Sequence, residues 1–288
     1  LKQLVSAGRL GRKSGHGFYT YEGNNVPVVV SDSQTPAQEG AMVASGITSV
    51  GVVGSGTMAT GIASVFASAG VNVLVLTRSE QRSQEVVNSL DASWTKLVAK
   101  SRITEEAKSA QLARITTCEN PEEFVGKVEL VIEAIAEELA PKCEIFATLD
   151  GLLAPEVIFA TTTSSLSVIE LAACTSRMDK FLGIHFFNPA PVMSLVEVVS
   201  TVATELAVVD RCTQLMRELG KNPVLCSDRA GFIVNALLFP YLNNAIAMAS
   251  SNYATIEDID TAMKLGCGYP MGPFELLDAV GLDVSLAI

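Results

Sequence analysis

Short apolar runs rich in β-branched residues alternate with stretches of helical periodicity through the middle of the chain. The runs are ITSVGVV (47–53), VNVLVLT (71–77), VELVIEAI (128–135), VIFATTT (157–163) and KFLGIHFF (180–187). Strands that alternate with helices in this way form a parallel sheet covered by helices on both faces. The pattern therefore predicts an α/β protein with a doubly wound parallel sheet.

The strand pattern stops after about residue 226, where helical periodicity takes over. GFIVNALLFPYLNNAIAMA (231–249) and TIEDIDTAMKLG (255–266) carry the apolar residues of this last part. We expect the α/β domain over residues 47–226 and a smaller all-α domain over residues 227–288. Residues 22–46 are rich in turn formers and have no sustained period, which predicts a linker.

Composition and charge narrow the class of protein. Of the 288 residues, 49% are hydrophobic, the mean hydropathy is +0.36 and the net charge is −11. Such a chain can bury a large core, and its acidic balance argues against nucleic-acid binding. No run of eighteen apolar residues occurs and no signal peptide opens the sequence, so we expect a cytoplasmic protein that does not enter a membrane.

The six cysteines are scattered and include no C-x-x-C pair. Such spacing predicts reduced thiols in the core, with neither a disulfide framework nor a metal site. The six are Cys118, Cys143, Cys174, Cys212, Cys226 and Cys267.

The first apolar run leads into a glycine-rich turn and then a helix, as VGVVGSGTMATGIA (50–63). In this G-x-G-x-x-A pattern, Gly54 allows the tight turn, Gly56 lets a pyrophosphate approach the backbone, and Ala59 permits close packing of helix on strand. Thr57 and Met58 then open the helix, whose positive N-terminus attracts phosphates. Because strand, turn, helix and second strand follow in order, we predict a Rossmann-type site for a nicotinamide dinucleotide.

The end of the second strand bears on which dinucleotide is bound. A site for NAD usually has an Asp or Glu there, whereas this chain has Thr77 followed by Arg78 and Ser79. A guanidinium beside two hydroxyls suits a 2′-phosphate. We therefore favour NADP(H) over NAD(H). In the alternative, Arg78 is a solvated surface charge and Glu80 reaches the ribose.

One of the two histidines, His185, ends the fifth run, and Glu197 follows twelve residues later in an apolar segment. A dehydrogenase must move a proton at the alcohol oxygen, and histidine suits that task at neutral pH. The carboxyl ends of such strands form the ligand crevice. His185 and Glu197 are therefore candidates for an acid/base dyad, although a structural histidine and a solvated glutamate would give the same spacing.

The chain resembles the L-3-hydroxyacyl-CoA dehydrogenase family, particularly its bacterial 3-hydroxybutyryl-CoA members, from about Ile47 to Ile288. The segments that carry the resemblance are GSGTMATGIA (54–63), VIEAIAEELAPK (131–142), TTSSLSV (162–168), GIHFFNPAPVMSLVEVV (183–199), DRAGFIVNALLFPYL (228–242) and MKLGCGYPMGPFELLDAVGLD (263–283). It implies reversible hydride transfer between carbon 3 of an L-3-hydroxyacyl-CoA and the nicotinamide, giving a 3-oxoacyl-CoA.

The resemblance also implies roles for particular residues. His185 matches the family's catalytic base, Glu197 the carboxylate that orients it, and Ser164 and Asn235 the polar groups that hydrogen-bond the substrate. The positions that line the nicotinamide-ribose side of the cofactor site are matched by Glu137, Lys142 and Asn188. Lys100 lies in the region that helps hold the coenzyme A phosphates, although a solvated lysine is an equal alternative. A homodimer formed through the helical domain is expected.

Several positions depart from the family pattern. The chain has Thr162 in place of Asn, Thr77 in place of an acid, and Ala230 in place of Pro. The first residues, LKQLVSAGRLGRKSGHGFYTY (1–21), resemble the segment that normally ends the family's C-terminal domain. We interpret residues 1–21 as the tail of a preceding copy or as a circular permutation, and expect the helical domain to be incomplete at its C-terminus.

Two other functions remain open. One is a related β-hydroxyacid dehydrogenase that acts on a free acid. The other is a catalytically silent copy in a tandem protein that serves as a binding or structural module, against which the four retained polar residues argue.

Overall fold

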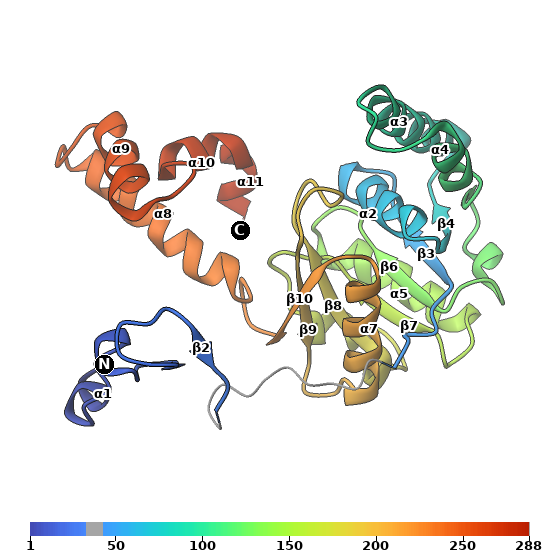
Figure 1. Cartoon of the computed structure of the whole chain (residues 1–288). Helices are drawn as coiled ribbons and strands as arrows, with labels where there is room; N and C mark the ends of the chain where they lie inside the picture. Colours follow the sequence, from blue (N-terminus) through green and yellow to red (C-terminus); the bar gives the residue numbers. More distant parts are fainter. Residues whose placement is uncertain (33–42, 288) are drawn as a thin grey trace. The chain divides into compact units, whose positions relative to one another are not determined.

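The computed structural model describes residues 1–32 and 43–287, and the chain divides into two units, Leu1–Val43 and Ala44–Ile288 (Figure 1). The first unit contains helix α1 (Lys2–Ser6), a 3₁₀ turn at Arg12–Ser14, and strands β1 (Thr20–Tyr21) and β2 (Val29–Val30). The two strands pair antiparallel. The predicted linker, residues 22–46, thus contains a short paired strand, and its residues 33–42 lie outside the described residues.

An eight-stranded sheet forms the centre of the second unit, in the order β10-β9-β8-β7-β6-β3-β4-β5. Its strands are β3 (Ser49–Val53), β4 (Asn72–Leu76), β5 (Ile115–Cys118), β6 (Leu130–Glu133), β7 (Ile158–Thr161), β8 (Phe181–Phe186), β9 (Leu195–Ser200) and β10 (Asn222–Ser227). All five predicted strands are present, and the doubly wound fold is confirmed. Strand β9 is the apolar segment that carries Glu197, while strands β5 and β10 were not predicted.

One strand pair contradicts the expectation of a wholly parallel sheet. Strands β8 and β9 are antiparallel, whereas every other neighbouring pair of this sheet is parallel. The reason is the short connection of residues 187–194, because a crossover to a parallel neighbour needs a dozen or more residues. Helix α7 (Leu206–Glu218) supplies such a crossover from β9 to β10.

Helices cover both faces of the sheet, in agreement with the prediction. Successive strand residues point to opposite faces, so Val52 and Val53 of β3 belong to two different hydrophobic clusters. The first cluster includes residues of α2 (Thr57–Ser68), α3 (Glu80–Ala99) and α7. The second includes residues of α5 (Leu139–Leu152) and α6 (Val168–Ala172). Helix α4 (Glu105–Leu112) packs against α3.

The last part of the chain is helical, as predicted. It consists of α8 (Val234–Ser250), α9 (Ile256–Cys267), α10 (Pro273–Val280) and α11 (Leu282–Ala287). Asp260 of α9 accepts the backbone N–H groups of Phe274 and Glu275 and so fixes the start of α10. Within residues 1–32 and 43–287, no helix combines the length and the apolar character that crossing a bilayer requires.

The prediction of reduced core thiols was wrong for three of the cysteines. Cys143 of α5 and Cys174 after α6 form a disulfide, because the packing of these two helices brings their Cα atoms to 5.4 Å. Cys267 is exposed at the end of α9. Cys118 and Cys212 are free and buried as expected, and burial raises the pKa of each thiol to about 12.

Candidate active site

The glycine-rich turn between β3 and α2 has the close packing that its sequence predicts. Gly54 has φ +127°, and a Cβ there would lie 2.6 Å from the carbonyl oxygen of Ala134 and 3.3 Å from Cβ of Ala59. Only glycine fits such a position. Gly56 precedes the first residue of α2, and a Cβ at Gly56 would meet nothing within 4 Å. The backbone at the N-terminus of α2 is therefore open to a ligand.

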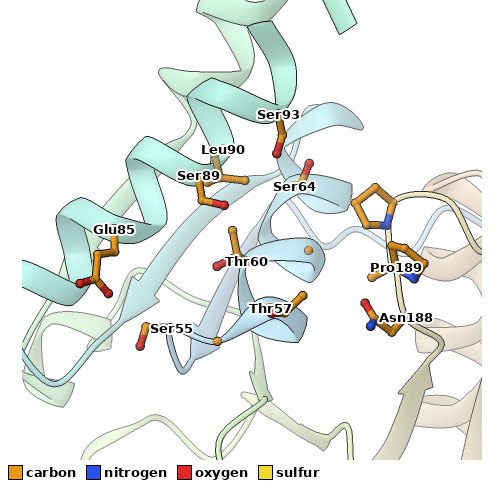
Figure 2. Close-up of a pocket in the computed structure, with 14 residues that line it drawn as sticks. Ser55, Thr57, Thr60, Ser64, Glu85, Ser89, Leu90, Ser93, Asn188 and Pro189 are labelled. Atoms are coloured by element: carbon orange, nitrogen blue, oxygen red, sulfur yellow. The ribbon is translucent and has the colours of Figure 1, made fainter. Parts of the chain in front are cut away.

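A cavity of about 390 Å³ lies beside this turn (Figure 2). Three parts of the chain form its wall: the glycine turn with α2, one side of α3, and the loop after β8. They contribute Ser55, Gly56, Thr57, Thr60, Gly61 and Ser64, then Glu85, Ser89, Leu90 and Ser93, and finally Asn188, Pro189, Ala190 and Pro191. Hydroxyl groups and the start of a helix give the cavity a wall suited to phosphate and ribose oxygens.

The residues predicted to choose the cofactor lie at the end of β4 and differ in exposure. Thr77 is buried, and its hydroxyl hydrogen-bonds to the carbonyl oxygen of Ser79 and to Oγ of Ser83. Arg78 is exposed, and Glu80 is the exposed first residue of α3. The Thr77 hydroxyl thus supports the local turn, while the Arg78 guanidinium is accessible to a ligand.

His185 and Glu197 face each other across the antiparallel strands β8 and β9. They are register partners, and Nδ1 of His185 lies 2.7 Å from Oε2 of Glu197. Both side chains are buried, with residue exposures of 4% and 1%. Because a carboxylate only accepts hydrogen bonds, Nδ1 carries a proton, which leaves Nε2 of the neutral ring as the acceptor.

Glu197 also fixes the beginning of α8. Its Oε1 accepts the N–H groups of Ile233 and Val234, each at 3.0 Å. Burial raises the pKa of Glu197, but the hydrogen bonds from His185 and these two amides outweigh it and hold the pKa below its ordinary value. The carboxylate therefore stays ionised beside the imidazole, and it joins the sheet to the helical part of the chain.

Ser164 lies at the other nitrogen of His185. The distance from Ser164 Oγ to Nε2 is 3.0 Å, so the hydroxyl donates to the nitrogen that would exchange a proton with a substrate. The aromatic rings of Phe187 and Phe232 flank the imidazole at centroid distances of 4.6 and 5.4 Å. Neither ring was predicted from the sequence, although Phe187 is part of the HFF sequence.

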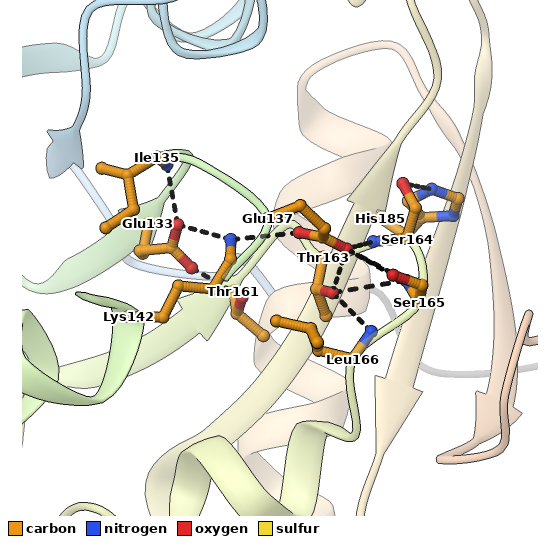
Figure 3. A network of polar contacts seen from close by, with 10 residues as sticks. All are labelled: Glu133, Ile135, Glu137, Lys142, Thr161, Thr163, Ser164, Ser165, Leu166 and His185. Carbon is orange, nitrogen blue, oxygen red and sulfur yellow. Dashed lines mark hydrogen bonds and ion pairs between the residues drawn. The ribbon is translucent and has the colours of Figure 1, made fainter. Parts of the chain in front are cut away.

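Glu137 holds the loop that carries Ser164 (Figure 3). Its Oε1 accepts the N–H groups of Ser164 at 2.8 Å and Ser165 at 3.1 Å, and the hydroxyl of Thr163 at 2.5 Å. Burial raises the pKa of Glu137, but these bonds and the charge of Lys142 together lower it below the ordinary value. Glu137 is thus ionised and fixes the loop that carries Ser164. Its side chain is 36% exposed.

Glu133 is a second carboxylate, linked to Glu137 through Lys142. It was not predicted from the sequence. Glu133 ends β6 and is fully buried, and its Oε1 accepts Nζ of Lys142 and the N–H of Ile135, both at 2.7 Å. Lys142 also lies 3.4 Å from Oε2 of Glu137. An acid inside the apolar run VELVIEAI was the available signal, because a buried charge requires a partner. The buried lysine therefore links two acids.

The remaining predicted residues lie in different places. Asn188 lines the cavity, and Asn235 is buried in the first turn of α8, next to Val234. Lys100 is exposed at the C-terminal end of α3. The structure brings His185, Glu197, Ser164 and Glu137 together through direct contacts, whereas Lys100 is outside this set.

Two family models match consecutive parts of the chain. "3-Hydroxyacyl-CoA dehydrogenase, NAD binding domain" matches residues 49–229, and "3-hydroxyacyl-CoA dehydrogenase, C-terminal domain" matches residues 231–288.

Several characterised proteins and structures are similar over most of their length. The mitochondrial hydroxyacyl-coenzyme A dehydrogenase of Sus scrofa is 45% identical over 242 residues, covering 82% of this chain and 77% of the relative. The 3-hydroxybutyryl-CoA dehydrogenase of Clostridioides difficile is 42% identical over 237 residues, covering 82% and 84%. The crystal structure of (S)-3-hydroxybutyryl-CoA dehydrogenase from Ralstonia eutropha superposes with a TM-score of 0.82 at 40% identity, covering 84% and 85%.

Proposed function

Because the chain belongs to the 3-hydroxyacyl-CoA dehydrogenase family, we propose that His185 is the general base and acid of its reaction. Membership makes the chain a nicotinamide-dependent oxidoreductase of 3-hydroxyacyl-CoA. The assignment rests on two hydrogen bonds of His185, one with Glu197 and one with Ser164. We further propose a short-chain substrate, 3-hydroxybutyryl-CoA, from the similarity to enzymes with that name.

In the proposed mechanism, Nε2 of His185 takes the proton of the substrate's 3-hydroxyl group. The nicotinamide supplies the acceptor for the hydride that leaves carbon 3. Glu197 stabilises the imidazolium that forms, since its carboxylate is ionised and lies 2.7 Å from Nδ1. Ser164 and Asn235 direct dipoles toward the substrate oxygen, where charge changes during the reaction. In the reverse direction, His185 returns the proton and the product is the L-3-hydroxyacyl-CoA.

The residues around the glycine turn fit the cofactor. Gly54, Gly56, Thr57 and Met58 would hold its pyrophosphate at the N-terminus of α2, where a Cβ at Gly56 has open space. Asn188 would contribute from the loop after β8 and Glu137 from the residues before α5, while Lys142, which is buried, would act through its ion pair with Glu137. The partly exposed side chain of Glu137 is compatible with a ribose contact.

We propose NADP(H) as the preferred cofactor and reduction of acetoacetyl-CoA as the favoured direction. The support is the exposed Arg78 at the end of β4, where the strand offers no carboxylate. The coenzyme A contact of Lys100, the homodimer and the cytoplasmic location stay predictions from the sequence. The interpretation of residues 1–21 as the tail of a preceding copy or as a permuted segment also stays a prediction. So do the domain limits 22–46, 47–226 and 227–288.

The test is the initial rate of acetoacetyl-CoA reduction, measured with NADPH and NADH for the wild type and for His185→Ala. We expect His185→Ala to lower kcat by on the order of 10² to 10⁴ while dinucleotide binding is retained. His16→Ala, which changes the chain's other histidine, is the matched control and should keep the wild-type rate. Equal rates for His185→Ala and wild type would refute the assignment. A wild type that binds dinucleotide without turnover would favour the alternative of a catalytically silent copy in a tandem protein. Turnover of the free acid in place of the thioester would favour the related β-hydroxyacid dehydrogenase.

A further inference from the structure

Lys221 is a buried cation that neither the glycine turn nor the His185 site explains. Helix α7 ends in a left-handed glycine, Gly220, with φ +73°. The N–H of Gly220 donates to the carbonyl of Arg217 and that of Lys221 to the carbonyl of Met216, which is the Schellman pattern. This cap fixes Lys221 immediately before β10, and the residue is 8% exposed.

The ammonium group of Lys221 is held by the loop between β8 and β9. Nζ donates to the carbonyl oxygen of Ala190 at 2.7 Å and to that of Met193 at 2.8 Å. Within residues 1–32 and 43–287, no carboxylate lies within ion-pair distance of this nitrogen. Burial lowers the pKa of Lys221. A buried charge must be stabilised by hydrogen bonds. Lys221 therefore holds the carbonyl groups of Ala190 and Met193 in place.

The same loop also packs against α2. Ala190 is 2% exposed, and a Cβ at Gly61 of α2 would lie 3.3 Å from Cβ of Ala190 and 3.4 Å from Cδ of Pro191. Asn188, Pro189, Ala190 and Pro191 form one wall of the 390 Å³ cavity, opposite hydroxyl groups of α2 and α3 (Figure 2). The loop therefore contacts both Gly61 of α2 and Lys221.

We propose that Lys221 is a positioning residue that holds residues 188–193 against α2 and thereby sets the width of the cavity for a nucleotide diphosphate. The proposal rests on the proposed function in assuming that the cavity receives such a group. Both the dinucleotide and coenzyme A contain a diphosphate, and the cavity touches the N-terminus of α2, where that group binds. Lys221 itself does not reach the reacting atoms; it acts through the loop that carries Asn188.

The test compares Lys221→Met, Lys221→Arg and Gly61→Ala with the wild type. Lys221→Met keeps an unbranched side chain that is one atom shorter and removes both hydrogen bonds to the loop. It should raise KM for NADPH or for acetoacetyl-CoA about tenfold, with kcat changed less than about threefold. Lys221→Arg retains donors and should restore most of the loss. The substrate whose KM rises identifies the diphosphate that the cavity receives.

Gly61→Ala is a second variant that should displace the same loop, because its Cβ would lie 3.3 Å from Cβ of Ala190. Gly61 also lines the cavity, so this variant tests the position of the loop and not Lys221 itself. Alanine also favours the helix, so the fold should tolerate it. Arg177→Lys is the matched control: Arg177 is another buried cation that donates to backbone carbonyls, of Ala154, Val157, Asp150 and Leu153, and it is not part of the cavity wall. It should lower the melting temperature and leave both KM values unchanged.

Dissociation constants for NADPH and for coenzyme A, measured without turnover, separate this proposal from the proposed function. If the wild type lacks activity, the proposed function fails, while weaker binding by Lys221→Met and Gly61→Ala would still support the positioning role. If both variants keep the wild-type KM and dissociation constants, the role of Lys221 is refuted even though the enzyme is active. An equal rise of KM in Arg177→Lys would also refute it, because the effect would then be a general loss of structure.

Discussion

His185 and Glu197 lie directly opposite each other on the antiparallel strands β8 and β9, with Nδ1 and Oε2 2.7 Å apart. Their spacing of twelve residues follows from a hairpin that places the two side chains on the same face of the sheet. Glu197 uses its second oxygen to hold the first amides of α8. One carboxylate therefore orients the candidate base and also fixes the helix that carries Asn235.

Replacing Glu197 by Gln should impair both tasks. The amide cannot stabilise an imidazolium as a carboxylate does, so we expect kcat to fall by on the order of 10². Steady-state rates with acetoacetyl-CoA measure the effect. Glu218→Gln is the matched control, since Glu218 likewise accepts a backbone amide, that of Ser45, away from the site. A rate for Glu197→Gln as high as that of Glu218→Gln would contradict the role of the carboxylate.

The same variant should change how stability depends on pH. The pKa of Glu197 in the folded chain is below its ordinary value of 4.5, so the ionised group stabilises the fold fully above that value. This contribution is lost as the pH falls below about 4.5 and through the folded-state pKa. Urea unfolding between pH 7 and pH 3 should therefore show a stability difference between wild type and Glu197→Gln that shrinks with acid. A difference that stays constant would argue against the depressed pKa.

Ser164 and Ser165 form a matched pair of neighbouring hydroxyls. Ser164 Oγ contacts Nε2 of His185, whereas Ser165 Oγ donates to Glu137. We expect Ser164→Ala to lower kcat/KM for acetoacetyl-CoA about tenfold or more, because a hydrogen bond at the reacting end of the imidazole is lost. Ser165→Ala should change it less than about threefold. The prediction fails if the two variants lose equal activity.

Arg78 should affect the two cofactors differently. If the exposed guanidinium binds a 2′-phosphate, Arg78→Gln will raise KM for NADPH about tenfold and leave KM for NADH nearly unchanged. Arg82→Gln is the control, because Arg82 is exposed in the following helix and is paired with Glu85. Parallel rises for NADPH and NADH, or a wild type that prefers NADH, would mean that Arg78 does not select the cofactor.

The Cys143–Cys174 disulfide should contribute measurably to stability. It closes a loop with a sequence separation of 31 residues, for which chain entropy predicts roughly 3 to 4 kcal/mol. A dithiol reductant should therefore lower the Tm by about 5 to 15 °C in a chain of this size. The double variant Cys143→Ser/Cys174→Ser should melt at the lower temperature with or without reductant. An unchanged wild-type Tm in reductant would show that the bond adds no stability.

The sequence by itself determined the features that depend on local order. Apolar periodicity predicted five strands of the sheet and the helical part after residue 226. The G-x-G-x-x-A turn predicted the glycine at Gly54, where a Cβ would lie 2.6 Å from the carbonyl oxygen of Ala134. Motif resemblance predicted that His185, Glu197 and Ser164 act together. These signals are local because propensity, turn chemistry and motif spacing act over a few residues.

Only the tertiary structure decided which distant groups meet. The short connection after β8 reversed the direction of β9, and this antiparallel pairing brought Glu197 to His185. Packing of α5 on α6 joined Cys143 to Cys174, and the end of α7 aimed Lys221 at the loop after β8. The partners in these pairs are 12 to 31 residues apart along the chain. Their contacts depend on how whole elements pack and on where buried charges find hydrogen bonds, which no pattern of neighbouring residues specifies.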